Sequence, residues 1–155
     1  MLNLSNKSSL FFDCLPSYDN GYLKVGNGHS IYFEQYGNPK GIPILFLHGG
    51  PGAGFSSSHK SFFDPNVFRV IFFDQRGSGK SIPYAETNHN NTQLLISDIE
   101  NLRKSLKIDK WYLFGGSWGS TLALLYGIDF PNRCLGFILR GIFLGCKIEI
   151  DWFLY

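Results

Sequence analysis

Residues 111–119 read Trp-Tyr-Leu-Phe-Gly-Gly-Ser-Trp-Gly, an apolar run followed by a serine set between glycines. The run at 111–114 predicts a buried strand, and the stretch 117–130, stopped by Pro131, predicts a helix. Glycines on both sides of the serine permit the sharp strand-to-helix turn that exposes a hydroxyl above a sheet. The pattern therefore makes Ser117 a candidate nucleophile.

Outward from this stretch, short apolar runs alternate with helical patterns. A helix is expected from Thr92, whose hydroxyl can cap it, because Leu95, Ile99, Leu102 and Leu106 form one apolar stripe. Further strands are expected at 22–25, 31–36, 42–47, 68–73 and 135–139, the first two joined by a hairpin turn at 26–28. The alternation predicts an α/β fold with a mainly parallel sheet and helices on both faces.

Composition and residue spacing argue against a nucleic-acid-binding protein, a membrane-spanning segment and a metal site. The chain has 155 residues, 44% of them hydrophobic, and a net charge of +2, so it can form one core and shows no basic stripe for nucleic acid. Its three cysteines form no CxxC motif, which favours a reducing, cytoplasmic compartment. The longest apolar stretch, 134–146, is too short to span a membrane and is interrupted by Arg140. No residues have metal-ligand spacing.

A glycine-rich segment, His48-Gly49-Gly50-Pro51-Gly52, directly follows the strand predicted at 42–47. A serine nucleophile needs fixed donors for the oxyanion that forms during acyl transfer. Backbone free of side chains can turn an N–H inward, so we expect one donor from Gly50 and the other from the backbone N–H of Trp118. The alternatives are a plain tight turn at 49–54 and an ordinary helix cap at Ser117.

A general base for Ser117 is harder to find. All four histidines (His29, His48, His59 and His89) precede the serine, whereas in this type of fold the acid and the histidine follow the nucleophile. His48 is expected to brace the glycine-rich loop rather than to accept a proton. Asp129 and Asp151 follow Ser117, but neither is expected at a strand end. The sequence therefore predicts an incomplete catalytic triad.

The segment 74–81, Asp-Gln-Arg-Gly-Ser-Gly-Lys-Ser, follows another predicted strand. Its Gly-Lys-Ser ending is typical of a phosphate-binding loop, but Asp74 stands where that motif requires a glycine. A nucleotide site is therefore the weakest interpretation. We expect instead that Asp74 and Arg76 form a buried, hydrogen-bonded brace that helps to fix the oxyanion loop.

Together these motifs resemble the proline iminopeptidases, serine peptidases of the α/β-hydrolase fold. The resemblance covers about residues 18–155 and is most specific at GGSWGSTLAL (115–124) and LRGIFL (139–144). It also includes GYL at 21–23, GNP at 37–39, HGGPG at 48–52, DQRGSGKS at 74–81 and residues 149–153.

This resemblance implies a serine aminopeptidase that releases N-terminal proline from peptides without a cofactor, Ser117 attacking the proline carbonyl and Trp118 helping to shape the proline pocket. It also implies that a helical cap, the acid and the base lie beyond Tyr155, so that the fold is truncated before the cap and last strands. We therefore expect a poorly ordered leader at 1–17, part of a hydrolase domain at 18–146, the start of a cap at 147–155, and little activity for the chain alone. The alternatives are another α/β-hydrolase, such as an esterase or amide hydrolase, and a catalytically dead fragment.

Overall fold

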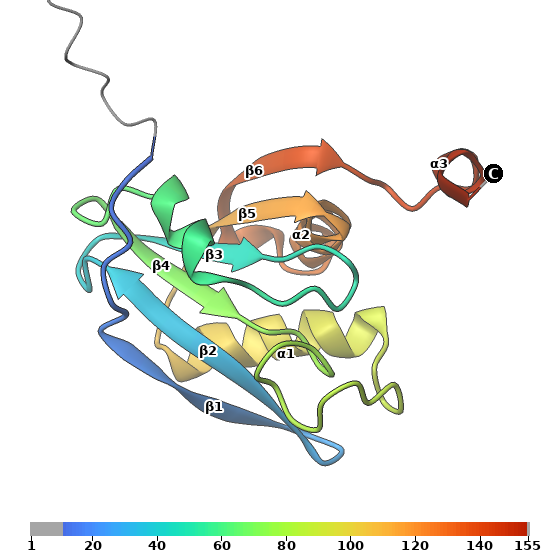
Figure 1. Ribbon diagram of the computed structural model, residues 1–155, viewed down its shortest axis with the longest axis horizontal. Helices are drawn as coiled ribbons and strands as arrows, with labels where there is room; N and C mark the ends of the chain where they lie inside the picture. Colours follow the sequence, from blue (N-terminus) through green and yellow to red (C-terminus); the bar gives the residue numbers. More distant parts are fainter. Residues whose placement is uncertain (1–10, 155) are drawn as a thin grey trace, which may run out of the picture.

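A six-stranded sheet, in the order β1-β2-β4-β3-β5-β6, forms the centre of the computed structural model, which describes residues 11–154 (Figure 1). β3, β4, β5 and β6 are parallel, whereas β1 and β2 run antiparallel at one edge. The strands span Asp19–Gly26, His29–Gly37, Ile42–Leu47, Phe68–Phe73, Trp111–Ser117 and Cys134–Ile142. The predicted α/β fold with a mainly parallel sheet is confirmed.

The hairpin between β1 and β2 turns at Asn27 and Gly28, both at positive φ (51° and 78°). Turns with positive φ at both central residues match the twist of paired strands, which explains the glycine-rich signal in the sequence. In the central strands β3 and β4, residues 44–47 and 70–73 are all apolar and buried because both faces of the sheet are covered there.

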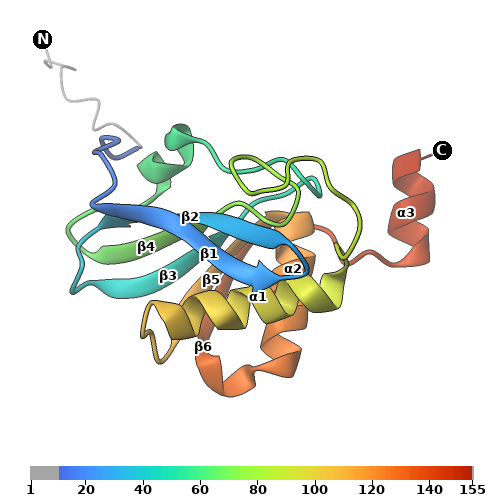
Figure 2. The ribbon, with the colours of Figure 1, turned by 90° about the horizontal axis from the view of Figure 1, so that it is seen from below.

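Both longer helices pack against one face of the sheet. α1 (Thr92–Ser105) and α2 (Trp118–Asp129) lie on the same side of the sheet (Figure 2). They bury Leu95, Ile99 and Leu122 in a core that also contains Trp111 and Ile71. On the other face the covering element is a short 3-10 helix, η1 (Ser57–Phe62), over a cluster of aromatic side chains. Helices thus lie on both faces, but only one face carries α-helices within residues 11–154.

The expected cap of α1 is one residue off. Asn91, not Thr92, is the N-cap: its side chain accepts a hydrogen bond from Leu94 N at 3.0 Å. Asparagine caps a helix as well as threonine does, and the extended backbone at Asn91 points its side chain back at the first turn, so the helix begins with Thr92 as its first residue.

The outer strand β6 and the segment after it are poorly covered. Phe137, Ile138 and Ile142 on β6 are exposed. The short helix α3 (Lys147–Leu154) projects away from the sheet at the end of a loop (Figures 1 and 2). The part of the chain that the structure describes contains no helix long and apolar enough to cross a bilayer.

Of the expected leader, residues 1–10 lie outside the described residues. Residues 11–17 have no regular secondary structure and are tied to the domain by hydrogen bonds: Phe12 N donates to Ser61 O, and the Tyr36 hydroxyl donates to Asp13 O, both at 2.9 Å. The boundaries at 17/18 and 146/147, and the assignment of 147–155 to a cap, stay predictions.

Candidate active site

Ser117 lies at the crest of the turn between β5 and α2. Its backbone has φ 53° and ψ −125°, a region that residues with a side chain rarely occupy. The side chain is exposed and makes no hydrogen bond to the first turn of α2. A helix-capping serine would have extended backbone and would accept such a bond, so this geometry is that of a presented hydroxyl rather than of an ordinary cap.

The glycines around Ser117 are required by close backbone contacts. A Cβ on Gly119 would lie 2.1 Å from Leu47 O, and a Cβ on Gly115 would lie 2.3 Å from Gly119 O. The start of α2 therefore lies directly against the ends of β3 and β5. Only residues without a side chain allow this approach, which is the physical reason for the G-x-S-x-G pattern here.

The loop after β3 passes beside Ser117. A Cβ on Gly49 would lie 3.2 Å from Ser117 Cβ and 3.8 Å from its Oγ. Gly50 follows with φ 115°, and Ala53 N donates to Gly49 O at 3.2 Å, closing the turn through Pro51 and Gly52. The structure thus places Gly49, the residue before Gly50, against the Ser117 side chain, and Trp118 follows Ser117 as the first residue of α2.

His48 is a buried part of this loop. Its Nδ1 lies 2.9 Å from Gly49 O, and its Nε2 lies 3.0 Å from Gln75 N. Gly54 N also donates to Nδ1, at 3.2 Å. Burial lowers the pKa of His48, which favours the neutral ring. Because the Gln75 amide occupies the Nε2 lone pair, the geometry is that of a brace and not of a base for Ser117.

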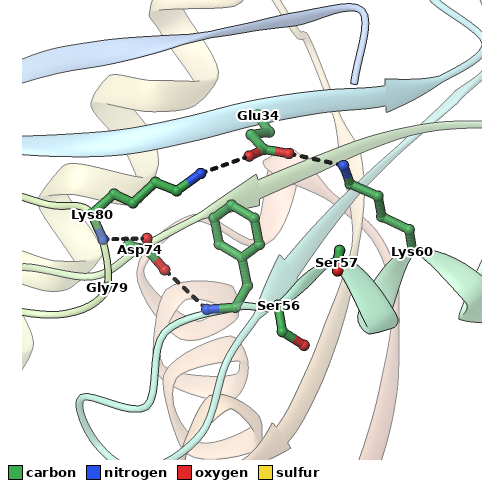
Figure 3. Close-up of a pocket in the computed structure, with 8 residues that line it drawn as sticks. Glu34, Ser56, Ser57, Lys60, Asp74, Gly79 and Lys80 are labelled. Atoms are coloured by element: carbon green, nitrogen blue, oxygen red, sulfur yellow. Dashed lines mark hydrogen bonds and ion pairs between the residues drawn. The ribbon is translucent and has the colours of Figure 1, made fainter. Parts of the chain in front are cut away.

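Asp74, at the end of β4, joins the loops that follow β3 and β4. Its carboxylate accepts hydrogen bonds from Phe55 N at 2.9 Å and from Lys80 N at 2.8 Å (Figure 3). A Cβ on Gly79 would lie 2.2 Å from this carboxylate, so the glycine leaves room for it. Hydrogen bonds from backbone N–H groups to a carboxylate are strong and fix the orientation of the groups that they join.

Arg76 is also buried, but its partner is Asp98 on α1. The guanidinium binds that carboxylate through Nε (2.6 Å) and Nη2 (2.8 Å), and it donates to Val25 O and His89 O. The single brace expected from the sequence is therefore two separate ones. Asp98 could not be recognised from the sequence because it is a polar residue on a helix, 22 positions away.

Two residues that the sequence did not single out also hold the turn. The Ser120 hydroxyl donates to Ser117 O at 2.6 Å and accepts from Phe143 N at 3.0 Å, which links the turn to the loop after β6. Gln75 donates to His48 O and accepts from the Trp118 indole. Ser120 lies in the motif at 115–124 and Gln75 in the motif at 74–81. Their position next to expected site residues in these motifs was the only sign in the sequence that they contribute to the site.

A cavity of about 330 Å³ is lined by Asp74 and Glu34 (Figure 3). The Glu34 carboxylate lies between Lys60 (3.0 Å) and Lys80 (3.4 Å) and accepts hydrogen bonds from Ser17 and Tyr32. Burial alone would raise the pKa of Glu34, but the hydrogen bonds from Ser17, Lys60 and Tyr32 outweigh it and lower the pKa to about 2. These charges satisfy one another, which indicates a structural ion cluster.

No hydrogen bond joins any of the four histidines to Ser117 within residues 11–154. His29 donates through Nε2 to Asn88 O, His59 accepts from Ser56 N, and His89 lies in an exposed loop. Asp129 ends α2, and Asp151 on α3 pairs with Lys147. The same residues contain no group of histidine, cysteine, aspartate or glutamate side chains that could hold a metal ion.

The fold agrees with a comparison to known families. Residues 42–154 match the family model described as alpha/beta hydrolase fold. The chain belongs to the alpha/beta hydrolase family. This hydrolase chain is 55% identical over 142 residues to a probable proline iminopeptidase of Leptolyngbya boryana, and 53% identical over 148 residues to a proline iminopeptidase of Arabidopsis thaliana. The resemblance inferred from the sequence motifs is therefore confirmed.

These matches cover 92% and 96% of the hydrolase chain but 44% and 39% of the two relatives. Among solved structures, a proline iminopeptidase-related protein of Thermus thermophilus superposes with a TM-score of 0.68 at 33% identity, covering 78% of this chain and 43% of that protein. The chain thus spans less than half the length of the relatives it matches.

Proposed function

We propose that this chain carries the nucleophile and the oxyanion hole of a serine aminopeptidase that releases N-terminal proline from peptides. The observation that supports the proposal most is the strained, exposed Ser117 between the Gly50 loop and the N-terminus of α2. The curated relatives at 53–55% identity are named proline iminopeptidases, which favours proline over other acyl groups.

In the proposed reaction, Ser117 Oγ attacks the carbonyl carbon of the N-terminal proline. The carbonyl oxygen becomes an oxyanion, which accepts hydrogen bonds from the backbone N–H groups of Gly50 and Trp118. Collapse of this intermediate breaks the peptide bond: the shortened peptide leaves as an amine, which takes up the proton that Ser117 lost to the base. The prolyl ester left on Ser117 is then hydrolysed by water to free proline. The Trp118 side chain contributes to the wall that contacts the proline ring.

The proton from Ser117 needs an acceptor that residues 11–154 do not offer. We propose that the base and its orienting acid come from polypeptide corresponding to the part of the relatives outside the match, more than half of their length. Residues 1–155 alone are then inactive.

Three unpaired cysteines support the expected reducing, cytoplasmic compartment.

A chimera tests this function. In it, the present chain replaces the matched 142-residue region of the Leptolyngbya boryana protein, which supplies the remainder. We expect prolyl-aminomethylcoumarin to be cleaved at least about tenfold faster than the alanyl analogue or a p-nitrophenyl ester, and Ser117→Ala to abolish all three activities. Preference for the ester, or proline release by the Ser117→Ala variant, would overturn the proposal.

A further inference from the structure

Gln75 joins the loop after β3 to the first residue of α2, the two segments that contain the proposed oxyanion donors. Its side chain is buried, with the residue only 2% exposed. The side-chain amide donates through Nε2 to His48 O at 2.9 Å and accepts through Oε1 from the Trp118 indole Nε1 at 3.1 Å. Its backbone N–H donates to His48 Nε2 at 3.0 Å. Gln75 therefore holds the ring and the carbonyl oxygen of His48 as well as the side chain of Trp118.

These contacts bear on the geometry of the oxyanion hole. His48 O belongs to the peptide bond that leads into Gly49, one residue before the Gly50 donor. Trp118 supplies the second donor through its own backbone N–H, and its indole is tied to Gln75 beside the loop. A rigid amide between the two segments sets the separation of the two donors, and donor placement controls how well they stabilise charge in the transition state.

We propose that Gln75 is a positioning residue for the oxyanion hole, which keeps the Gly50 loop and Trp118 at a fixed separation. The proposal rests on the proposed function of Ser117 and adds a residue that does not itself contact substrate. Its consequence is specific: loss of the Gln75 amide lowers kcat, because the donors act on the transition state, and leaves KM nearly unchanged.

The test compares Gln75→Leu, Gln75→Glu and the matched control Gln35→Leu in the same chimera. Gln35 is also buried, but its side chain bonds Arg69 and Asp19 at the antiparallel edge of the sheet, away from the loops at Ser117. Rates are expressed per mole of enzyme titrated with a fluorophosphonate, so that misfolded material does not count. Trp118→Phe identifies the indole N–H signal of Trp118 by NMR.

We expect Gln75→Leu to lower kcat by about 10- to 100-fold with KM changed less than about twofold, and to speed hydrogen exchange at the Trp118 indole. Gln75→Glu keeps an acceptor for the indole but loses the donor to His48 O, so it should keep slow indole exchange and recover only part of kcat. Gln35→Leu should leave kcat per titrated site within about twofold. If Gln75→Leu yields no titratable enzyme, Gln75→Glu takes its place in the comparison of kcat with the parent chimera and with Gln35→Leu.

An unchanged kcat in Gln75→Leu or Gln75→Glu, or an equal loss in Gln35→Leu, would overturn the proposal. An unprotected Trp118 indole in the parent chimera would overturn it independently of activity. If the parent chimera does not cleave prolyl substrates, the proposed function fails, while indole exchange still shows whether Gln75 holds Trp118.

Discussion

At the scale of single residues, the unusual feature is the backbone of Ser117. A residue with a Cβ at φ 53° and ψ −125° costs about 1–3 kcal/mol relative to relaxed backbone. No hydrogen bond of its side chain within residues 11–154 repays this cost, so the conformation persists because the surrounding contacts at Gly115 and Gly119 impose it. Strain of this kind, kept where the hydroxyl is exposed, is typical of a site where chemistry takes place.

Replacing Ser117 by glycine should stabilise the fold even though it removes the hydroxyl. Glycine relieves the positive-φ strain, which more than offsets the extra freedom of the unfolded chain, so we expect Ser117→Gly to be about 1 kcal/mol more stable than Ser117→Ala. Midpoints of urea denaturation of the two chimeras measure the difference. Equal midpoints, or a less stable glycine variant, would show that the backbone at this position is not strained.

The residues that the sequence identified are those whose chemistry depends on neighbours in the chain. That Ser117, Gly50 and Trp118 lie just after apolar strands could be predicted from the sequence, whereas their catalytic roles stay proposals. The partners of Arg76 and Gln75 could not be predicted, because Asp98 and Trp118 approach them only through the packing of helices on the sheet. Spacing along the chain carries no information on such contacts.

At the scale of elements, the position of α2 depends on one close approach. Gly119, in the first turn, faces Leu47 O at the end of β3, and any side chain there would overlap with backbone. The same approach sets where the helix N-terminus, and hence the Trp118 amide, lies relative to the loop at Gly50. The site is therefore built on the packing of a helix against two strands.

Gly119→Ala should therefore destabilise the chimera by about 3 kcal/mol or more, because the backbone of β3 or α2 has to move. Gly21→Ala is the matched control: a Cβ there meets only ring atoms of Phe33 at 3.6 Å, an ordinary contact, and the change should stay within about 1 kcal/mol. Thermal and urea denaturation of both variants provide the measurement. Tolerance of alanine at 119 would contradict this account of α2.

The ion cluster between β2, η1 and the loop after β4 predicts a pH dependence of stability. The pKa of Glu34 in the fold is about 2, below its ordinary 4.5, so its stabilising contribution is complete above pH 4.5 and is lost as the pH falls toward 2. Glu100, beside Arg103, has its pKa lowered to about 2 and acts in the same window.

Glu34→Gln should therefore lose less stability than the parent between pH 5 and pH 3, although it is less stable at pH 7. The contribution of Glu100 is common to both proteins, so the difference between their urea midpoints at each pH isolates Glu34. Parallel pH profiles for the two proteins would mean that the cluster does not depend on the charge of Glu34.

At the scale of the whole molecule, the sheet is well covered at its centre and open at β6. Exposed apolar side chains on this strand, among them Phe137, Ile138 and Ile142, lie along an outer edge with unpaired backbone groups. Such an edge can pair with another chain. The order of strands and helices was predictable from apolar periodicity, but which face the helices cover was not, because the sequence pattern of a strand buried on both sides is the same for either face.

Residues 1–155 alone should self-associate through this edge. We expect the weight-average mass from light scattering to rise with protein concentration, and Ile138→Lys with Ile142→Lys to reduce that rise, because charge on an outer strand opposes pairing. The matched change Ile128→Lys, at an exposed position of α2, should have little effect. A monodisperse monomer with a cooperative thermal transition would contradict this prediction.

Covalent labelling can locate the nucleophile directly. The chimera is treated with a fluorophosphonate, and the modified residue is identified by mass spectrometry while the rate of proline release is followed. We expect one phosphonate per molecule on Ser117, with activity lost in proportion to labelling. Modification at another residue, or full activity with Ser117 labelled, would contradict it.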